Sequence, residues 1–195
     1  VLSDIVGDPL DMIASGPAYP DASTAEQALA IVKKYALHLS DEALSCLEAP
    51  TPNHLSNVET HITGSVRALC AAAQDAAQKL GFQCRMLTDC LDCEAREAGR
   101  FLASIARSHQ QTERPLAFFA GGETVVHLTG QGLGGRNQEL ALAAAPGLRG
   151  TQNTAVCSFG SDGTDGPTDA AGGFVDQSSD AALRAAGLDV PQVLA

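Results

Sequence analysis

The sequence predicts an α/β protein: a three-layer α/β/α sandwich with a mixed, mostly parallel sheet, plus a remnant of a second α/β domain. Two observations lead to this fold class. From residue 59 to residue 186, short apolar or β-branched runs alternate with longer segments of helical periodicity, the order typical of parallel sheets. Hydrophobic residues make up 45% of the 195 residues and charged residues only 18%, a composition that supports a packed core and is atypical of disorder.

The chain is expected to contain two domains, both incomplete. Two prolines fall between Glu48 and Asn57 and mark the best internal boundary. We therefore predict the end of an N-terminal domain at residues 1–57 and a second α/β/α domain, lacking its C-terminal end, at residues 58–195. Val1-Leu2 is expected to end a buried strand, and a lone strand cannot bury itself. This indicates a piece of a longer protein.

Capping signals and hydrophobic periodicity place the individual elements. Ser23 with Glu26 predicts a capping box at the start of a helix, and a shorter helix is expected after Ser40. A close pair of strands around Gly121 predicts at least one antiparallel neighbour. Further strands are expected at 59–63, 82–88, 116–120, 124–128 and 154–159, and helices at 65–80, 93–109, 137–145 and 180–186.

Composition excludes several classes of protein. The net charge of −11 argues against nucleic-acid binding, which depends on Lys and Arg contacts to phosphate. No apolar run approaches the roughly 18 residues that a membrane span needs. Cys90 and Cys93 form a lone CxxC without a second pair or histidines at ligand spacing, so zinc is not predicted and a redox motif is a minor alternative. We expect a reduced, cytoplasmic chain.

The first candidate binding segment is the glycine-rich run that precedes Arg136. It follows a predicted strand and opens a predicted helix, where exposed backbone N–H groups and the helix dipole favour an anion. Arg136 adds a bidentate donor. The run is not a Walker loop, and no acidic residue follows it at the roughly 20-residue spacing of a Rossmann dinucleotide site. From Leu116 to Leu183 the only basic residues are Arg136 and Arg149, among seven acids, a pattern that suits a metal-bridged anion.

The second candidate segment follows the predicted strand that ends at Phe159. Residues 161–169 hold three carboxylates and three hydroxyls, hard oxygen ligands of the kind that Mg²⁺ prefers. Asp162, Asp165 or Asp169 is expected to hold metal or to take a hydroxyl proton. The alternative is that these side chains only satisfy turn backbone.

The N-terminal segment offers a third group of candidates. Asp4, Asp8 and Ser15 follow the expected first strand, and ligands of open α/β sheets gather beyond the carboxyl ends of strands. An ordinary turn rich in Asp, Gly and Pro is an equal alternative at this stretch.

Three motifs give the sequence a family resemblance. Gly-Gly-Glu-Thr at 121–124, Gly-Gly-Arg-Asn-Gln-Glu-Leu-Ala-Leu at 134–142 and the run from Gly160 to Gly172 resemble the MOFRL family of class II glycerate kinases, which carry an older annotation as hydroxypyruvate reductases. The segment from Ser3 to Pro17 resembles the end of that family's N-terminal domain.

The resemblance implies ATP- and Mg²⁺-dependent phosphorylation of D-glycerate, mostly at the 2-hydroxyl, in a cleft between two α/β/α domains. Arg136 matches the family arginine important for activity, and Asp165 is the second residue expected to act in catalysis. Metal binding is assigned to Asp162 and Asp169. Substrate and ATP binding is assigned to Asp4, Asp8, Ser15, Glu123, Asn137, Ser161, Thr164 and Thr168.

The family's lysine-bearing N-terminal half and its C-terminal Thr-Gly-rich loop are absent from these residues, and no lysine follows Lys79. We therefore expect the chain to be inactive by itself and to need the missing N-terminal half of the enzyme. The alternatives are a non-catalytic nucleotide-binding or interaction remnant and a hydroxypyruvate reductase. Homo-oligomer formation is left open.

Overall fold

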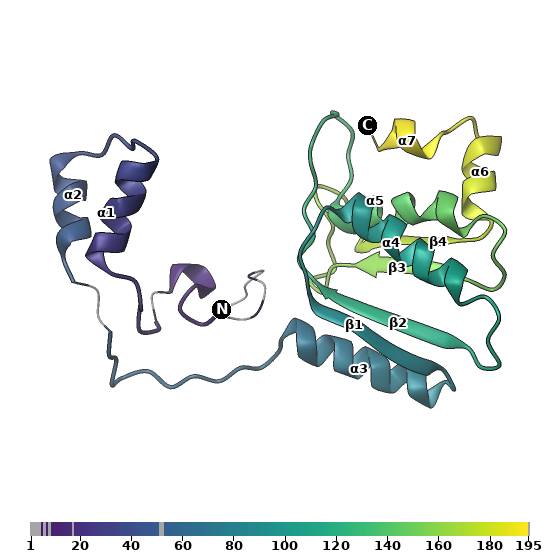
Figure 1. The fold of residues 1–195 in the computed structure, drawn as a ribbon, viewed down its shortest axis with the longest axis horizontal. Helices are drawn as coiled ribbons and strands as arrows, with labels where there is room; N and C mark the ends of the chain where they lie inside the picture. Colours follow the sequence, from purple (N-terminus) through teal and green to yellow (C-terminus); the bar gives the residue numbers. More distant parts are fainter. Residues whose placement is uncertain (1–4, 6, 8, 17, 51–52, 195) are drawn as a thin grey trace. The chain divides into compact units, whose positions relative to one another are not determined.

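A computed structural model describes residues 5, 7, 9–16, 18–50 and 53–194. The chain divides into two compact units, Val1–Ser65 and Val66–Ala195, which are described separately below (Figure 1). The predicted domain bounds of 1–57 and 58–195 stay a prediction. The strand expected to end at Val1-Leu2 lies outside the described residues.

The first unit contains the short 3-10 helix η1 (Ile13–Ser15) and the helices α1 (Ala25–Lys34) and α2 (Asp41–Glu48). The capping box of α1 lies one residue later than predicted. Thr24 Oγ1 accepts from the Gln27 N–H at 3.3 Å, and the Thr24 N–H donates to Gln27 Oε1 at 2.9 Å.

Ser23 is not the cap because its N–H is already bonded to Asp21 Oδ1 at 2.7 Å in the turn before the helix. The start of α2 is confirmed, since Ser40 Oγ accepts from the Ala43 N–H at 3.2 Å. The strand predicted at 59–63 is wrong: these residues are exposed and pair with no other strand in the described part of the chain.

The second unit contains four strands in two pairs. Strand β1 (Gln83–Leu91) runs parallel to β2 (Leu116–Gly122), and β3 (Ala155–Phe159) runs antiparallel to β4 (Gly172–Asp176). The α/β class is confirmed, and the strands are mixed in direction as expected.

The antiparallel partner differs from the expected one. The strand predicted at 124–128 is wrong, because only Val125 forms an isolated parallel bridge, to Glu94. Beyond that bridge, the β-branched run finds no strand edge to pair with, and Leu128 is almost fully exposed. Strand β4 supplies the antiparallel neighbour instead.

Helices cover the strands of this unit from two sides (Figure 1). Helix α3 (Val66–Lys79) packs on β1 and β2, while α5 (Arg136–Ala144) packs on β3 and β4 and against α4 (Ala95–Ser108). The 3-10 helix η2 (Ala145–Leu148) continues α5. Two short helices, α6 (Ser179–Ala185) and α7 (Val190–Val193), end the unit. No helix among the described residues is long and apolar enough to cross a membrane.

The core of the second unit is a seam of small side chains between α4 and α5. Gly99 of α4 lies against the backbone carbonyl of Leu140, so closely that a Cβ at this position would collide with it. Close backbone approach of this kind requires glycine. The seam fixes α5 against α4 and thereby fixes where α5 begins. The buried core cluster around this seam also includes residues of η2, β3 and β4, and its members are Ala95, Ala98, Ala103, Leu140, Ala141, Ala144, Ala145, Leu148, Val156 and Val175.

Candidate anion site at the start of helix α5

Three loops that are distant in the sequence meet at the first turn of α5. Arg136 begins the helix and forms an ion pair with Glu123, which follows the end of β2. The next two residues, Asn137 and Gln138, both bond to Asp165 in the loop between β3 and β4. The three glycine-rich runs predicted to carry function are therefore parts of one site.

Asp165 is the buried centre of this site, with a relative exposure of 3%. Its Oδ1 accepts from the Asn137 N–H and from Asn137 Nδ2, both at 3.0 Å. Its Oδ2 accepts from the Gln138 N–H at 2.8 Å and from Gln138 Nε2 at 3.1 Å. Each carboxylate oxygen thus accepts one backbone and one side-chain hydrogen bond.

These bonds change how the start of α5 is interpreted. Backbone N–H groups at a helix start attract anions, and the anion bonded to Asn137 and Gln138 is the protein's own carboxylate. Burial raises the pKa of Asp165, but the hydrogen bonds from Gln138 and Asn137 outweigh it and hold the pKa below its ordinary value of 3.8. Asp165 is therefore ionised near neutral pH and caps the helix.

Two glycines let the Asp165 loop approach the helix start. A Cβ on Gly135 would lie about 2.5 Å from the carboxylate oxygens of Asp165. Gly166 has a φ of +61°, and a Cβ there would collide with the Gly134 carbonyl. Both contacts explain why this run is rich in glycine, whereas Gly132 and Gly134 face open space.

Further hydrogen bonds hold the same loop. Gln138 Nε2 donates to Thr168 Oγ1 at 3.0 Å, and Thr168 Oγ1 donates to the Asp165 carbonyl at 2.7 Å. Ser158 Oγ donates to Asn137 Oδ1 at 2.6 Å, which fixes the orientation of the amide. Gln138 and Ser158 thus belong to the site although sequence reasoning assigns them no role. The polar Arg-Asn-Gln-Glu run contains a signal for Gln138; nothing in the sequence marks Ser158.

Arg136 is the basic side chain of this site. Its side chain is 43% exposed and that of its partner Glu123 is 24% exposed. The backbone of Glu123 is held at the strand end, because its N–H donates to the Leu91 carbonyl at 2.9 Å. Gly122, the preceding residue, lies against Leu91 at a φ of +155°, with no room for a Cβ. The Glu123 carboxylate is therefore held close to the guanidinium.

The exposed side of the site carries oxygen atoms. Asp162 accepts from the Thr164 N–H at 3.1 Å and from Thr164 Oγ1 at 3.2 Å. These hydrogen bonds and, more weakly, the charge of Arg136 hold the pKa of Asp162 below its ordinary value. Ser161 and Asp169 are exposed on the same loop.

The oxygen atoms present fit a magnesium ion in kind. The described residues contain no group of three or more His, Cys, Asp or Glu side chains able to hold a metal. Magnesium commonly binds through one or two carboxylates together with substrate phosphate. Asp162 and Asp169 supply two exposed carboxylates on one loop, and their roles as ligands stay a prediction.

A second ion pair supports α5 from behind. Arg96 of α4 donates from Nε to Glu139 Oε1 at 3.0 Å and from Nη2 to the Leu194 carbonyl at 3.1 Å. Both side chains are mostly buried. This contact ties the first turn of α5 to α4 and to the end of α7.

Another buried carboxylate stabilises the far end of this unit. Asp180 of α6 accepts from Arg149 Nε at 3.0 Å and Nη2 at 2.5 Å, and from Arg184 Nε at 3.0 Å. Burial raises the pKa of Asp180, but the two arginines outweigh this effect and lower it. The cluster anchors α6 and contributes no atom to the site at α5.

The described structure does not test the N-terminal candidates. Asp4 and Asp8 lie outside the described residues. Ser15 ends the short helix η1 of the first unit, which is described by itself. The assignments of Asp4, Asp8 and Ser15 therefore stay predictions.

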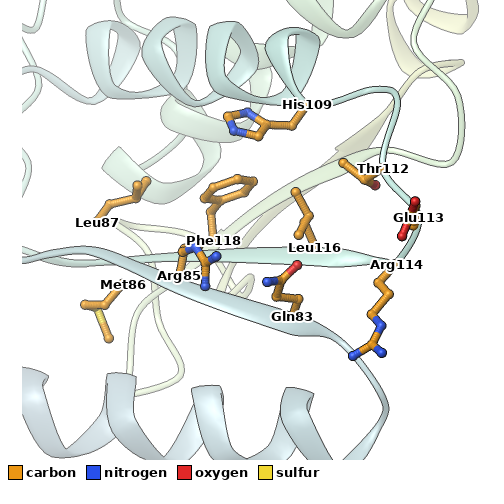
Figure 2. A pocket seen from close by; sticks show the side chains of 10 residues that line it. All are labelled: Gln83, Arg85, Met86, Leu87, His109, Thr112, Glu113, Arg114, Leu116 and Phe118. Atoms are coloured by element: carbon orange, nitrogen blue, oxygen red, sulfur yellow. The ribbon is translucent and has the colours of Figure 1, made fainter.

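One hollow of the second unit lies elsewhere (Figure 2). It has a volume of about 690 Å³ and opens where β1 and β2 begin, beside the edge-to-face pair of His109 and Phe118, whose ring centroids are 5.0 Å apart. It shares no residue with the site at α5. Ligands of α/β sheets bind beyond the carboxyl ends of strands, and Glu123 is at that end. We therefore assign the site to α5 and not to this hollow.

Comparison with known proteins shows what the chain is similar to. The MOFRL family model matches residues 116–195, and a model described as a domain of unknown function (DUF4147) matches residues 1–48. The D-glycerate 2-kinase of Thermotoga maritima is 53% identical over 198 residues, and the glycerate 2-kinase of Pyrococcus horikoshii is 38% identical over 209 residues. Both alignments cover 100% of this chain, and 48% and 47% of the respective relatives.

A solved structure gives the same answer. The crystal structure of glycerate kinase from Thermotoga maritima matches with a TM-score of 0.89 at 52% identity, over 100% of this chain and 48% of that one. The chain spans about half the length of the curated relatives that it matches. This agrees with the prediction that a further half of the protein is needed. Residues 116–195 match the MOFRL family model, and the chain as a whole is similar to part of known glycerate kinases.

Proposed function

We propose that this chain forms one wall of an active site that transfers the γ-phosphoryl group of ATP to D-glycerate, at the 2-hydroxyl by preference. The single observation that carries this proposal is the half-exposed guanidinium of Arg136 at the start of α5, between Glu123 and the loop that bears Asp162. Phosphoryl transfer needs cationic stabilisation of charge on the transferred group. Arg136 is the basic group of this site that meets the requirement.

Arg136 binds an oxygen of the transferred phosphoryl group in this proposal. Asp162 and Asp169 would hold a magnesium ion, which supplies charge neutralisation on the phosphates when bound. Ser161 and Thr164 are exposed on the same loop, and their hydroxyls would bind substrate oxygens.

We propose a role for Asp165 that differs from the expected catalytic one. Each of its oxygens already accepts two hydrogen bonds. A depressed pKa also makes a carboxylate a weak base. We propose that Asp165 positions Arg136 and Asn137 and takes no proton from substrate.

The proposal requires a second wall. A kinase of this kind is expected to use a lysine as well as an arginine. Residues 80–195 contain no lysine. The relatives are about twice as long as this chain. We propose that the remaining part of the protein supplies the lysine and closes the site, and that this chain alone does not transfer phosphate.

The test is Arg136→Ala in the polypeptide that contains this chain at its natural length. We expect ATP-dependent phosphorylation of D-glycerate to fall roughly 10³-fold, because one preorganised charge contact to a transition state contributes about that factor. The far-UV circular dichroism spectrum should not change, since Arg136 is half-exposed. Arg100→Ala is the matched control: it removes an exposed arginine, paired with Glu97 on α4, away from the site.

Full kinase activity in the Arg136→Ala variant would contradict the proposal. The same preparations also test the reductase alternative, by NADH oxidation with hydroxypyruvate. The sequence has no GxGxxG followed by an acidic residue at the spacing of a dinucleotide site, so we expect no oxidation. A robust rate that survives Arg136→Ala would favour the reductase.

A further inference from the structure

Glu123 is the residue of this site whose function the kinase proposal leaves open. The phosphate-binding arginine does not face an empty space, because its guanidinium is paired with the Glu123 carboxylate. That carboxylate comes from a rigid position: the Glu123 N–H is bonded to the Leu91 carbonyl and the preceding Gly122 lies against Leu91. A phosphate that approaches Arg136 therefore meets a fixed negative charge.

We propose that Glu123 makes this site select phosphate groups that already carry a divalent cation and reject metal-free ones. The inference rests on the proposed phosphate-binding role of Arg136. It assigns Glu123 a role in specificity rather than direct substrate binding.

The charge balance around Arg136 supports this. One guanidinium faces the carboxylate of Glu123, and its charge also acts on the carboxylate of Asp162. The three groups sum to one net negative charge. A metal-free polyphosphate, itself strongly negative, is repelled by that sum, whereas a magnesium complex is repelled less and offers a cation to the carboxylates.

The solvent exposure of the pair makes the effect measurable. The Glu123 side chain is 24% exposed and that of Arg136 is 43% exposed. A ligand can therefore reach the guanidinium without unfolding of the loop, and its affinity depends on how strongly Glu123 competes. If Glu123 only held the Arg136 side chain in place, its replacement would change the affinity for metal-free and metal-bound phosphate ligands equally.

The experiment compares Glu123→Gln with wild type by isothermal titration calorimetry, using tripolyphosphate in EDTA and in excess Mg²⁺. It uses the polypeptide that contains this chain at its natural length. We expect the variant to bind metal-free tripolyphosphate about tenfold more tightly than wild type, a factor that corresponds to about 1.4 kcal/mol. Affinity for the magnesium complex should change less than about threefold, so the preference for the complex shrinks.

Glu97→Gln is the charge control, because it removes the same unit charge from an exposed ion pair on α4. It should leave both affinities unchanged. The inference would be overturned if Glu123→Gln bound both ligands more weakly than wild type, or if neither affinity changed. In either case Arg136→Ala would still abolish binding, so the phosphate site itself would stand. Binding that survives Arg136→Ala would instead overturn the phosphate site, and the inference with it. Thermal unfolding of each variant shows whether it is folded.

Discussion

Asp165→Asn is the sharpest test of how this site is built. The carboxylate accepts four hydrogen bonds, two at each oxygen, with donor distances between 2.8 Å and 3.1 Å. An asparagine has one oxygen and one amide group. Two of the four bonds therefore survive, and the new NH₂ group faces two donors in place of an acceptor.

The expected loss follows from these contacts. A hydrogen bond to a charged group contributes roughly 1.5–3 kcal/mol to stability. A buried polar group that is left without a partner costs roughly a further 1–3 kcal/mol. The side-chain donors can turn toward water, so we expect the variant to lose about 3 kcal/mol of unfolding free energy. For a domain of this size that corresponds to a decrease in Tm of about 10 °C.

The assay is thermal unfolding followed by far-UV circular dichroism. Asp162→Asn is the matched control, because Asp162 is exposed on the same loop and bonds only to the neighbouring Thr164 in the described structure. It should unfold with the wild-type midpoint. If Asp165→Asn shared that midpoint, the carboxylate would not be the centre of this loop junction.

The pH dependence gives a second check. The pKa of Asp165 lies below 3.8 in the folded state because donated hydrogen bonds outweigh the effect of burial. Its contribution is therefore fully present above 3.8, the ordinary value, and is lost as pH falls through the folded-state pKa. The difference in unfolding free energy between wild type and Asp165→Asn should be constant near neutral pH and should shrink below about pH 3.8. A difference that grows in acid would refute the reasoning.

Two further substitutions test neighbouring contacts. Gly135→Ala places a Cβ against the Asp165 carboxylate and should cost about 1–3 kcal/mol, as overpacking of a tight contact does; Gly132→Ala, which faces open space, is the control in urea unfolding. Asp180→Asn removes a buried partner of two arginines. Because those arginines are more than half exposed, we expect a loss of only about 1–2 kcal/mol, and a loss above about 4 kcal/mol would show that they are not free to reach water.

Local sequence patterns were sufficient to predict helices α3, α4, α5 and α6 of the second unit, whereas the short α7 was not predicted. Helix α4 and helix α5 lie within two residues of their predicted ranges. Apolar periodicity marks α4, and the glycine-rich run before Arg136 marks the start of α5. The strands were harder. Strand β4, Gly172–Asp176, begins with two glycines, which have low strand propensity and give no strand signal. The run 124–128 has strong strand propensity but lies beside no strand edge with which it could pair. Tertiary contacts therefore decided the outcome for both β4 and this run.

The site shows the same limit. The glycine runs and Arg136 could be predicted to form a binding surface because their composition exceeds what turns need. The capping role of Asp165 could not, because its partners are 27 and 28 residues away in the sequence. Nor does any local pattern show that Arg136 is paired with Glu123. Roles that depend on contacts between distant loops need the folded structure.

The distance between α5 and its cap has a consequence for folding during synthesis. Helix α5 emerges from the ribosome before Asp165, whose carboxylate follows the Asn137 N–H by 28 residues. Until then the first turn of α5 lacks that partner, and isolated short helices are marginal in water. The surface around Arg136 should therefore be assembled late, when the β3–β4 loop docks. A nascent chain arrested before residue 165 would present α5 with a frayed start and Arg136 without a fixed position.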